Sequence, residues 1–145
     1  MAEPYRLGFV RRLLNAAVRL GVLTGLAPRR FSLLTVRGRT SGRLHSTPVI
    51  VLTQGADRWL VAPYGERAWV KNARAAGEVT LSRGRHRETL TVEEVGPTMA
   101  AQILKQYLRD TPITRRFFAV TPDAPLGDFV REAPQHPVFR LGKRQ

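Results

Sequence analysis

The segment with the clearest chemical potential is a polar stretch with two glycines, Gly38–Arg43 (GRTSGR), placed between two apolar runs. Glycines allow positive φ and close backbone approach, and successive N–H groups in such a turn form an anion-binding nest. Thr40 and Ser41 add hydroxyl groups, while Arg39 and Arg43 add planar guanidinium groups that match phosphate oxygens in pairs. The Walker and Rossmann glycine patterns are both missing. The residues alone predict a phosphate-binding turn or, as the commoner alternative, a solvated β-turn.

A second segment, Val61–Val79 (VAPYGERAWVKNARAAGEV), joins a predicted strand to a predicted helix through a Pro-Tyr-Gly turn. We expect this turn to present backbone amide groups and the phenol of Tyr64 at the rim of a sheet. Asn72 lies inside the predicted helix, where asparagine is disfavoured, and this indicates a hydrogen-bonding role. Trp69 has a simpler interpretation as a core residue, and Lys71 as a residue of a solvated helix face.

The charge balance predicts an anionic ligand or partner. The chain has 24 basic and 11 acidic residues, which gives a formal net charge of +13. A G+C-rich genome would explain many arginines, but it would not remove acidic residues. Such a field concentrates anions, so nucleic acid, an anionic membrane and a phosphorylated cofactor all fit. The absence of cysteine excludes disulfides and thiolate chemistry. The three histidines lie far apart without metal-ligand spacing, so no metal site is expected.

The organisation along the chain predicts one domain, residues 1–145. Apolar residues at three- and four-residue steps predict an N-terminal amphipathic helix over about 4–24, with arginines on its other faces. Five or six strand-like segments follow, separated by turns and by helices over 67–76 and from Gly96 to 108. Residues 111–127 are expected to be irregular around a short helix, and 136–141 to form a last strand. This pattern is typical of a small antiparallel β-barrel.

Three motifs, in this order and spacing, resemble the deazaflavin-dependent nitroreductase family of actinobacterial-type flavin and deazaflavin oxidoreductases. They are LLTVRGRTSGRLHSTPV (Leu33–Val49), WLVAPYG (Trp59–Gly65) and AWVKNARAAGEV (Ala68–Val79). The resemblance covers about residues 31–95. It implies a mainly β fold with flanking helices, an FMN-binding split barrel-like β-barrel of about six antiparallel strands. It also implies coenzyme F420 as cofactor and a reductase that passes a hydride to a small organic acceptor, such as a quinone, enone, nitro compound or similar activated double bond. Cytoplasmic residence is expected separately, because arginines interrupt the N-terminal apolar segment and no apolar run is long enough to span a bilayer.

The resemblance also implies a set of site residues, carried over by position. The phosphate would be held by Arg39, Thr40, Ser41 and Gly42. The ring system would meet His45, Ser46, Thr47, Pro48, Val49 and Ile50, then Ala62, Pro63, Tyr64 and Gly65, and on the helix Ala68, Trp69, Val70, Lys71 and Asn72. Tyr64 is also the candidate catalytic proton donor, with water as the alternative. Phe117 and Phe118 are expected to cover the substrate pocket, or else to be ordinary core residues. The family's nitroreductase has lysine, tyrosine and serine where this chain has Thr40, Ile50 and Tyr64, which leaves the acceptor open.

Other functions fit the same residues. A split barrel could instead hold FMN, haem or a fatty acid, since the fold does not decide the ligand. A non-enzymatic nucleic-acid-binding barrel would suit the charge, but aromatic residues are only 8% of the chain and form no row among the arginines. The N-terminal helix could make peripheral contact with an anionic membrane, or pack on the barrel or a second subunit of a homodimer.

Overall fold

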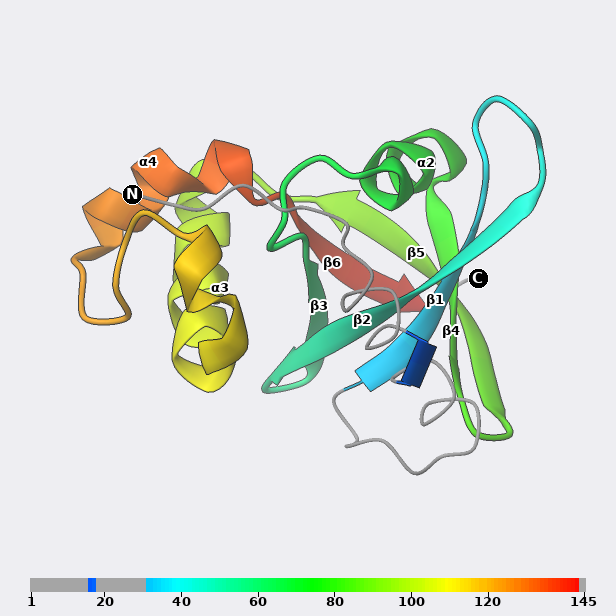
Figure 1. Ribbon diagram of the computed structural model, residues 1–145, viewed down its shortest axis with the longest axis horizontal. Helices are drawn as coiled ribbons and strands as arrows, with labels where there is room; N and C mark the ends of the chain where they lie inside the picture. Colours follow the sequence, from blue (N-terminus) through cyan, green and yellow to red (C-terminus); the bar gives the residue numbers. More distant parts are fainter. Residues whose placement is uncertain (1–15, 18–30, 144–145) are drawn as a thin grey trace.

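The computed structural model describes residues 16–17 and 31–143 (Figure 1). A β-barrel forms one half of the view, and the helices α3 and α4 pack against each other beside it. The predicted N-terminal helix over about 4–24 lies outside the described residues except for Ala16 and Ala17, which are helical. Any membrane contact through that helix therefore also remains a prediction.

The barrel consists of antiparallel strands, which confirms the predicted fold class. In the described chain its strands are β1 (Phe31–Arg37), β2 (Leu44–Gln54), β3 (Asp57–Val61), β4 (Glu78–Arg83), β5 (His86–Glu94) and β6 (Val138–Lys143). Hydrogen bonding closes them in the order β1-β2-β3-β6-β5-β4, and every neighbouring pair is antiparallel. Closure leaves no strand edge unpaired, which removes the main aggregation hazard of a small sheet.

Alternating side chains fill the barrel. On β1, Leu34 and Val36 join an inner cluster with Leu60, Leu90 and Phe139 from other strands. These residues are nearly completely buried. The intervening β1 residues face the outer side of the barrel, so each strand has an apolar inner row and a second row available for helices or ligands.

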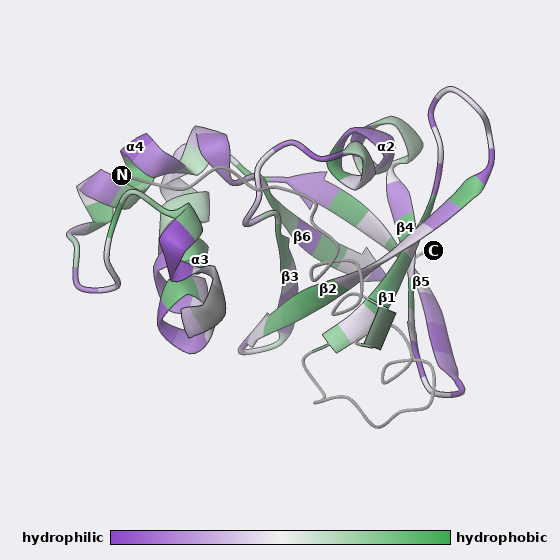
Figure 2. Cartoon of the chain, in the orientation of Figure 1, coloured by the Kyte–Doolittle hydropathy of each residue, from purple (hydrophilic) through white to green (hydrophobic). Residues whose placement is uncertain are grey.

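The helices cover two regions of the barrel. α2 (Ala68–Ala76) packs against β1, β4 and β5, and it ends at Gly77, whose φ of 75° is the left-handed conformation that favours glycine. α3 (Pro97–Asp110), η1 (Pro112–Phe117), α4 (Leu126–Glu132) and η2 (Ala133–Gln135) belong to a second apolar cluster that includes outer-row side chains of β2 and β3. Figure 2 shows the corresponding mixture of hydrophobic and hydrophilic stretches along α3 and α4.

Several elements differ from the sequence prediction. The β-branched run after Pro48 predicts a strand over residues 48–53, but β2 begins at Leu44, because pairing with β1 continues from Leu33–Pro48 to Arg37–Leu44. α4 and η2 were not predicted; α4 has seven residues, and its N-cap Pro125 makes no side-chain cap bond. The last strand begins at Val138, so His136 precedes it. Among the described residues, no helix has the length and apolar character needed to cross a bilayer.

Candidate functional site

The turn between β1 and β2, residues 38–43, projects from the barrel beside α2 (Figure 1). Its backbone is closed by hydrogen bonds from the Gly38 amide to the Arg43 carbonyl (2.7 Å) and from the Gly42 amide to the Gly38 carbonyl (3.0 Å). Gly42 has a φ of 74°, which residues other than glycine adopt with strain. Arg37 donates from Nη1 to the Gly42 carbonyl at 2.6 Å and braces the turn from outside.

The tip of this turn offers free hydrogen-bond donors. Thr40 and Ser41 are exposed, and their backbone amides have no partner among the described residues. The Ser41 hydroxyl accepts a bond from the Arg43 amide (3.1 Å), so it shapes the turn. The side chains of His45 and Ser41 pack against Gly38, where an added Cβ would lie 2.9 Å from both His45 Nε2 and Ser41 Oγ. Two adjacent free amides at the tip of one turn suit an anion.

Asn72 of α2 holds the turn in place. Its Oδ1 accepts hydrogen bonds from the Arg39 amide (3.1 Å) and from Arg39 Nη1 (2.7 Å), and the residue is only 4% exposed. The hydrogen-bonding role expected of Asn72 is thus met inside the protein. Arg39 Nη1 donates in this contact, and the contact fixes the orientation of the remaining N–H groups of the guanidinium group.

Two further cations lie at this corner of the molecule. The guanidinium group of Arg43 and the ammonium group of Lys71 make no recorded contact within the described residues. Arg74, one turn along α2 from Lys71, is instead paired with Glu66 (2.7 Å) and Glu94 (2.6 Å). These carboxylates raise the pKa of Arg74, chiefly through the hydrogen bonds to Glu94. Arg74 therefore fastens α2 to the barrel, while Arg43 is available to a ligand.

Sequence reasoning noticed Arg43 in the turn but left it out of the candidate binding residues, and it missed Arg37. Both are exposed arginines in an arginine-rich chain, so nothing in their type separates them from the rest. The sequence signal that could have identified them is their position, one at each end of the turn. This end of the candidate site therefore consists of residues 37–43 with Asn72 behind them.

The candidate residues on β2 divide between the two faces of the strand. Ile50 packs against the second apolar cluster, which lies outside the barrel and is here called the outer cluster. Ser46 and Pro48 lie on the same face of β2 as Ile50, because side chains along a strand alternate with a period of two residues. Ser46 Oγ lies 2.8 Å from Thr35 Oγ1 on the neighbouring strand. Of the remaining candidates, Val49 lies in the inner cluster. From residue 45 to residue 50 the strand spans about 17 Å at roughly 3.3 Å per residue.

Three predicted cofactor residues belong to the barrel core. Val49, Ala62 and Val70 are buried, with 8%, 1% and 0% exposure, and they belong to the inner cluster. Trp69 packs on the same cluster, with its ring 6.0 Å from that of Phe139. A cofactor would meet the three buried residues through their backbones. On α2, Ala68 is exposed beside Trp69, and Lys71 is exposed beside the buried Asn72.

The turn of Pro63, Tyr64 and Gly65 lies between β3 and α2 and brings two predicted aromatic residues together. The Tyr64 ring meets the Phe117 ring edge to face, with centroids 4.8 Å apart. The guanidinium group of Arg116 lies over the Phe117 ring, 5.1 Å from its centroid. Phe118 is buried, and its ring stacks on His136 at 3.8 Å instead of joining this pair. Both phenylalanines are therefore buried core residues, and they differ in their neighbours: Phe117 lies beside Tyr64, and Phe118 beside His136.

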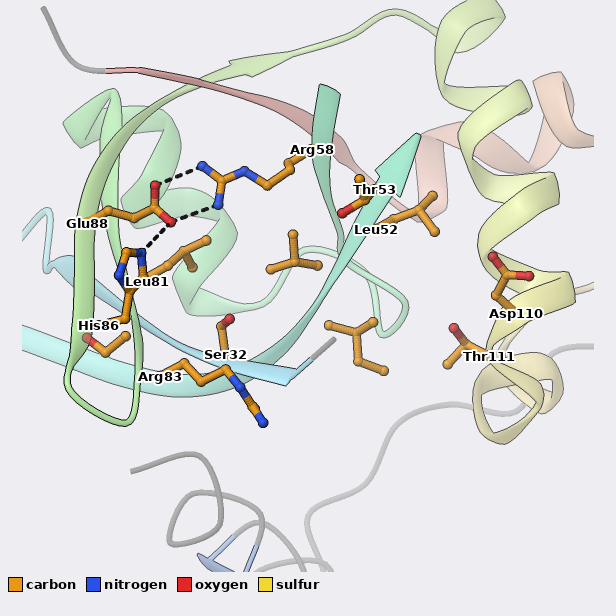
Figure 3. Close-up of a pocket in the computed structure, with 13 residues that line it drawn as sticks. Ser32, Leu52, Thr53, Arg58, Leu81, Arg83, His86, Glu88, Asp110 and Thr111 are labelled. Atoms are coloured by element: carbon orange, nitrogen blue, oxygen red, sulfur yellow. Dashed lines mark hydrogen bonds and ion pairs between the residues drawn. The ribbon is translucent and has the colours of Figure 1, made fainter. Parts of the chain in front are cut away.

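A separate pocket of about 740 Å³ lies around the end of the barrel away from the 38–43 turn (Figure 3). Its lining runs from the β4–β5 hairpin, across the ends of β2 and β3, to Asp110 and Thr111 at the end of α3. Ile50 is the one predicted site residue that lines it. The volume suits a small molecule.

Most of the charged and titratable side chains of this pocket form ion pairs or hydrogen bonds with one another. Arg58 and Glu88 form two parallel hydrogen bonds of 2.8 Å, and His86 Nε2 lies 3.4 Å from Glu88. Arg83 donates to the Phe31 carbonyl at 3.1 Å. The hydrogen bond from Arg58 lowers the pKa of Glu88 from 4.5 to about 2. The pKa of Arg58 is raised by the same hydrogen bond. The pair is a charged brace across the barrel mouth.

Comparison with known proteins places these features in a family. A family model described as F420H(2)-dependent quinone reductase matches residues 10–120, more than half of the chain. No curated protein sequence matches the chain.

Solved structures share the fold. One described as a domain-swapped dimer has 18% identity and a TM-score of 0.59, with 92% of this chain and 96% of the other covered. An F420-H2 dependent reductase, FDR-A, has 19% identity and a TM-score of 0.55, with 78% and 94% covered. HutZ, the heme storage protein of Vibrio cholerae, has 12% identity and a TM-score of 0.55, with 81% and 83% covered. At these identities the matches show the barrel fold alone.

Proposed function

The chain belongs to the F420H(2)-dependent quinone reductase family and is an F420-dependent reductase, and from this premise we propose that residues 37–43 and Asn72 hold the cofactor's phosphate-bearing tail. The observation that carries this proposal is the pair of unpartnered amides of Thr40 and Ser41 at the tip of the turn. An anion there would also meet the unpaired guanidinium group of Arg43. Charge-assisted bonds of this kind are roughly twice as strong as neutral ones.

The residues present suit such a cofactor along its length. An acidic tail needs cations, and Arg39, Arg43 and Lys71 supply them at one end. The outer face of β2 then leads from Ser46 to Ile50, beside the region where the Tyr64–Phe117 pair lies. We assign the ring system to this face of β2, with backbone contacts from Ala62 and the helix start at Ala68.

When bound in its reduced form, the cofactor supplies a hydride to the acceptor. The contribution of the protein is to hold and orient the two reactants and to exclude water. Tyr64 and Phe117 would form the wall against which a flat acceptor packs, since aromatic pairs favour planar ligands. The Tyr64 hydroxyl is the candidate donor of the proton that completes the reduction. A quinone, or another activated double bond, is the acceptor class that this wall fits best.

A homodimer is part of the proposal. A structure of the same fold is described as a domain-swapped dimer, and this supports the assembly expected from the sequence. Sedimentation of the purified protein, with and without cofactor, would measure the oligomeric state.

The test of the proposed function is cofactor binding followed by turnover. We expect fluorescence titration to show tight binding of F420 and weak or no binding of FMN. Arg43→Ala should weaken F420 binding about 10- to 100-fold, the range for a hydrogen bond to a charged group. Arg85→Ala is the matched control because it removes the same charge from the β4–β5 hairpin, beyond the opposite end of β1.

Turnover then identifies the acceptor class. Reduced F420 should be oxidised by a soluble naphthoquinone faster than by a nitroaromatic compound of similar size. Equal F420 affinity in Arg43→Ala and Arg85→Ala, or preferential binding of FMN, would contradict the proposed tail site.

A further inference from the structure

A buried histidine and glutamate lie directly behind the Tyr64 turn. His136 and Glu132 are 3% and 5% exposed, and His136 Nε2 lies 2.8 Å from Glu132 Oε2. The other ring nitrogen, Nδ1, lies 2.9 Å from the carbonyl oxygen of Pro63. Both nitrogens of one imidazole are thus within hydrogen-bonding distance of oxygen atoms.

The hydrogen-bonding partners determine where the protons are. A carbonyl oxygen only accepts, so His136 Nδ1 must carry a hydrogen. A second proton must lie between Nε2 and Glu132, because two facing lone pairs would repel in a buried site. Glu132 Oε2 also accepts a bond from the Ala119 amide at 2.9 Å. One proton is therefore shared between the imidazole and the carboxyl group, and the pair carries no net charge.

Stacking on Phe118 favours the arrangement in which the shared proton lies on His136. The His136 ring lies parallel to the Phe118 ring, with centroids 3.8 Å apart and an interplanar angle of 13°. A cation over an aromatic face is attracted by its quadrupole, and the attraction grows when the site is dry. Phe118, which sequence reasoning placed in the substrate pocket, thus supports the charged ring from its buried side.

The pair joins the segments that carry Tyr64 and Phe117. His136 binds the Pro63 carbonyl, one residue before Tyr64, while Glu132 binds the Ala119 amide, two residues after Phe117. The strand end is fixed as well, since the Ala62 amide donates to the Pro137 carbonyl at 2.9 Å. The two rings that meet at 4.8 Å are held by one buried ion pair.

We propose that His136 and Glu132 are positioning residues that hold the Pro63–Tyr64–Gly65 turn against Phe117 and so set the acceptor's place in the site. Neither touches the acceptor. The part of this proposal that concerns the acceptor rests on the proposed function, whereas the holding of the turn does not.

The informative variants differ in which contact they remove. Glu132→Gln keeps an oxygen that can accept from the Ala119 amide and removes the negative charge that faces His136 Nε2, so the Pro63 contact survives with a neutral ring. His136→Phe alone leaves the buried Glu132 carboxyl group without its histidine partner, which is expected to destabilise the fold strongly. The double change His136→Phe with Glu132→Gln keeps a stacked ring on Phe118 and no buried charge, but it frees the Pro63 carbonyl. The matched control is His86→Phe with Glu88→Gln at the barrel mouth.

Two measurements test the pair without turnover. In ¹⁵N NMR of the wild-type protein at neutral pH, both ring nitrogens of His136 should be protonated, and Nε2 should lose its proton in Glu132→Gln. Amide hydrogen exchange at Tyr64 and Gly65 should be about tenfold faster in the His136→Phe, Glu132→Gln variant, the scale of one lost hydrogen bond. The barrel-mouth control should leave these two amides unchanged.

Kinetics test the link to the acceptor. In the same double variant the KM for a naphthoquinone should rise about tenfold, while F420 affinity stays within a factor of about two. An unprotonated Nε2 in the wild type, or unchanged amide exchange in the folded double variant, would overturn the proposed pair. If F420 affinity falls by the same factor as KM rises, the proposed positioning role of His136 and Glu132 would be overturned. Absence of F420 binding in the wild type would instead remove the proposed function and leave the NMR and exchange results decisive for the pair.

Discussion

Asn72 Oδ1 accepts two hydrogen bonds from Arg39, one from its backbone amide at 3.1 Å and one from Nη1 at 2.7 Å. The two residues lie 33 positions apart in the sequence, so this contact joins α2 to the turn between β1 and β2. Asn72 is buried and Arg39 is exposed. Asn72 was expected to touch the cofactor. In the structure it instead holds Arg39, the residue that would touch the cofactor.

Replacing Asn72 should separate the two roles of this contact. Asn72→Ala removes the acceptor, and we expect it to lower the free energy of unfolding by about 1–2 kcal/mol and to weaken F420 binding. Asn72→Asp retains an acceptor for Arg39, so the fold should be kept, but the added negative charge should still weaken binding of an anionic tail. Chemical denaturation and fluorescence titration measure the two effects. Unchanged F420 affinity in both folded variants would contradict the assignment of the tail to this turn.

A methyl group at Gly38 should disturb the turn more than the fold. An added Cβ would lie 2.9 Å from His45 Nε2 and Ser41 Oγ, and both are ends of exposed side chains that can move. We expect Gly38→Ala to cost about 1 kcal/mol of stability, while F420 affinity falls about tenfold because Ser41 is displaced. Gly127→Ala is the control, since an added Cβ there meets nothing within 4 Å. Similar affinity in the two variants would argue against a ligand at the 38–43 turn.

Much of the barrel could be predicted because its signals are local. The helix predicted over 67–76 is observed as α2 over Ala68–Ala76, and Gly77 marks its end in the sequence as in the structure. α4 could not be predicted, since seven residues without a side-chain cap are helical mainly through packing on α3. The start of β2 was also missed, because it depends on pairing with β1 and not on its own residues.

The sequence indicated which segments form the candidate site, but not which role each of their residues has. The 38–43 turn and the start of α2 were singled out, and the Arg39–Asn72 contact joins them. The sequence does not show which side chains face the barrel core, and so Val49 and Val70 were grouped with exposed residues. Nor does it show that His136 is buried beside Glu132, since a histidine and a glutamate four residues apart are common on exposed helices.

Acid should weaken the brace at the barrel mouth. The pKa of Glu88 is lowered from 4.5 to about 2 by the hydrogen bond from Arg58, so this pair stabilises the fold above pH 4.5. Its contribution is lost as pH falls from 4.5 towards 2, when the native carboxylate must bind a proton. Because both side chains are partly exposed, we expect a contribution of about 1 kcal/mol. Glu88→Gln should therefore be less stable than the wild type at neutral pH and equally stable near pH 2. A constant difference between the two unfolding curves across this range would contradict the prediction.

The Tyr64 hydroxyl should affect turnover without affecting cofactor binding. Tyr64→Phe keeps the ring that meets Phe117 at 4.8 Å, so the wall for the acceptor should remain in place. If the hydroxyl gives the proton, kcat for quinone reduction should fall about 10²-fold, the lower range for a general acid. F420 affinity and quinone KM should change by less than about threefold. Phe117→Leu supplies the comparison, because it alters the wall and keeps the hydroxyl, and it should raise KM more than it lowers kcat. A kcat for Tyr64→Phe equal to that of the wild type would assign proton delivery to water, and Tyr64 would then contribute only its ring.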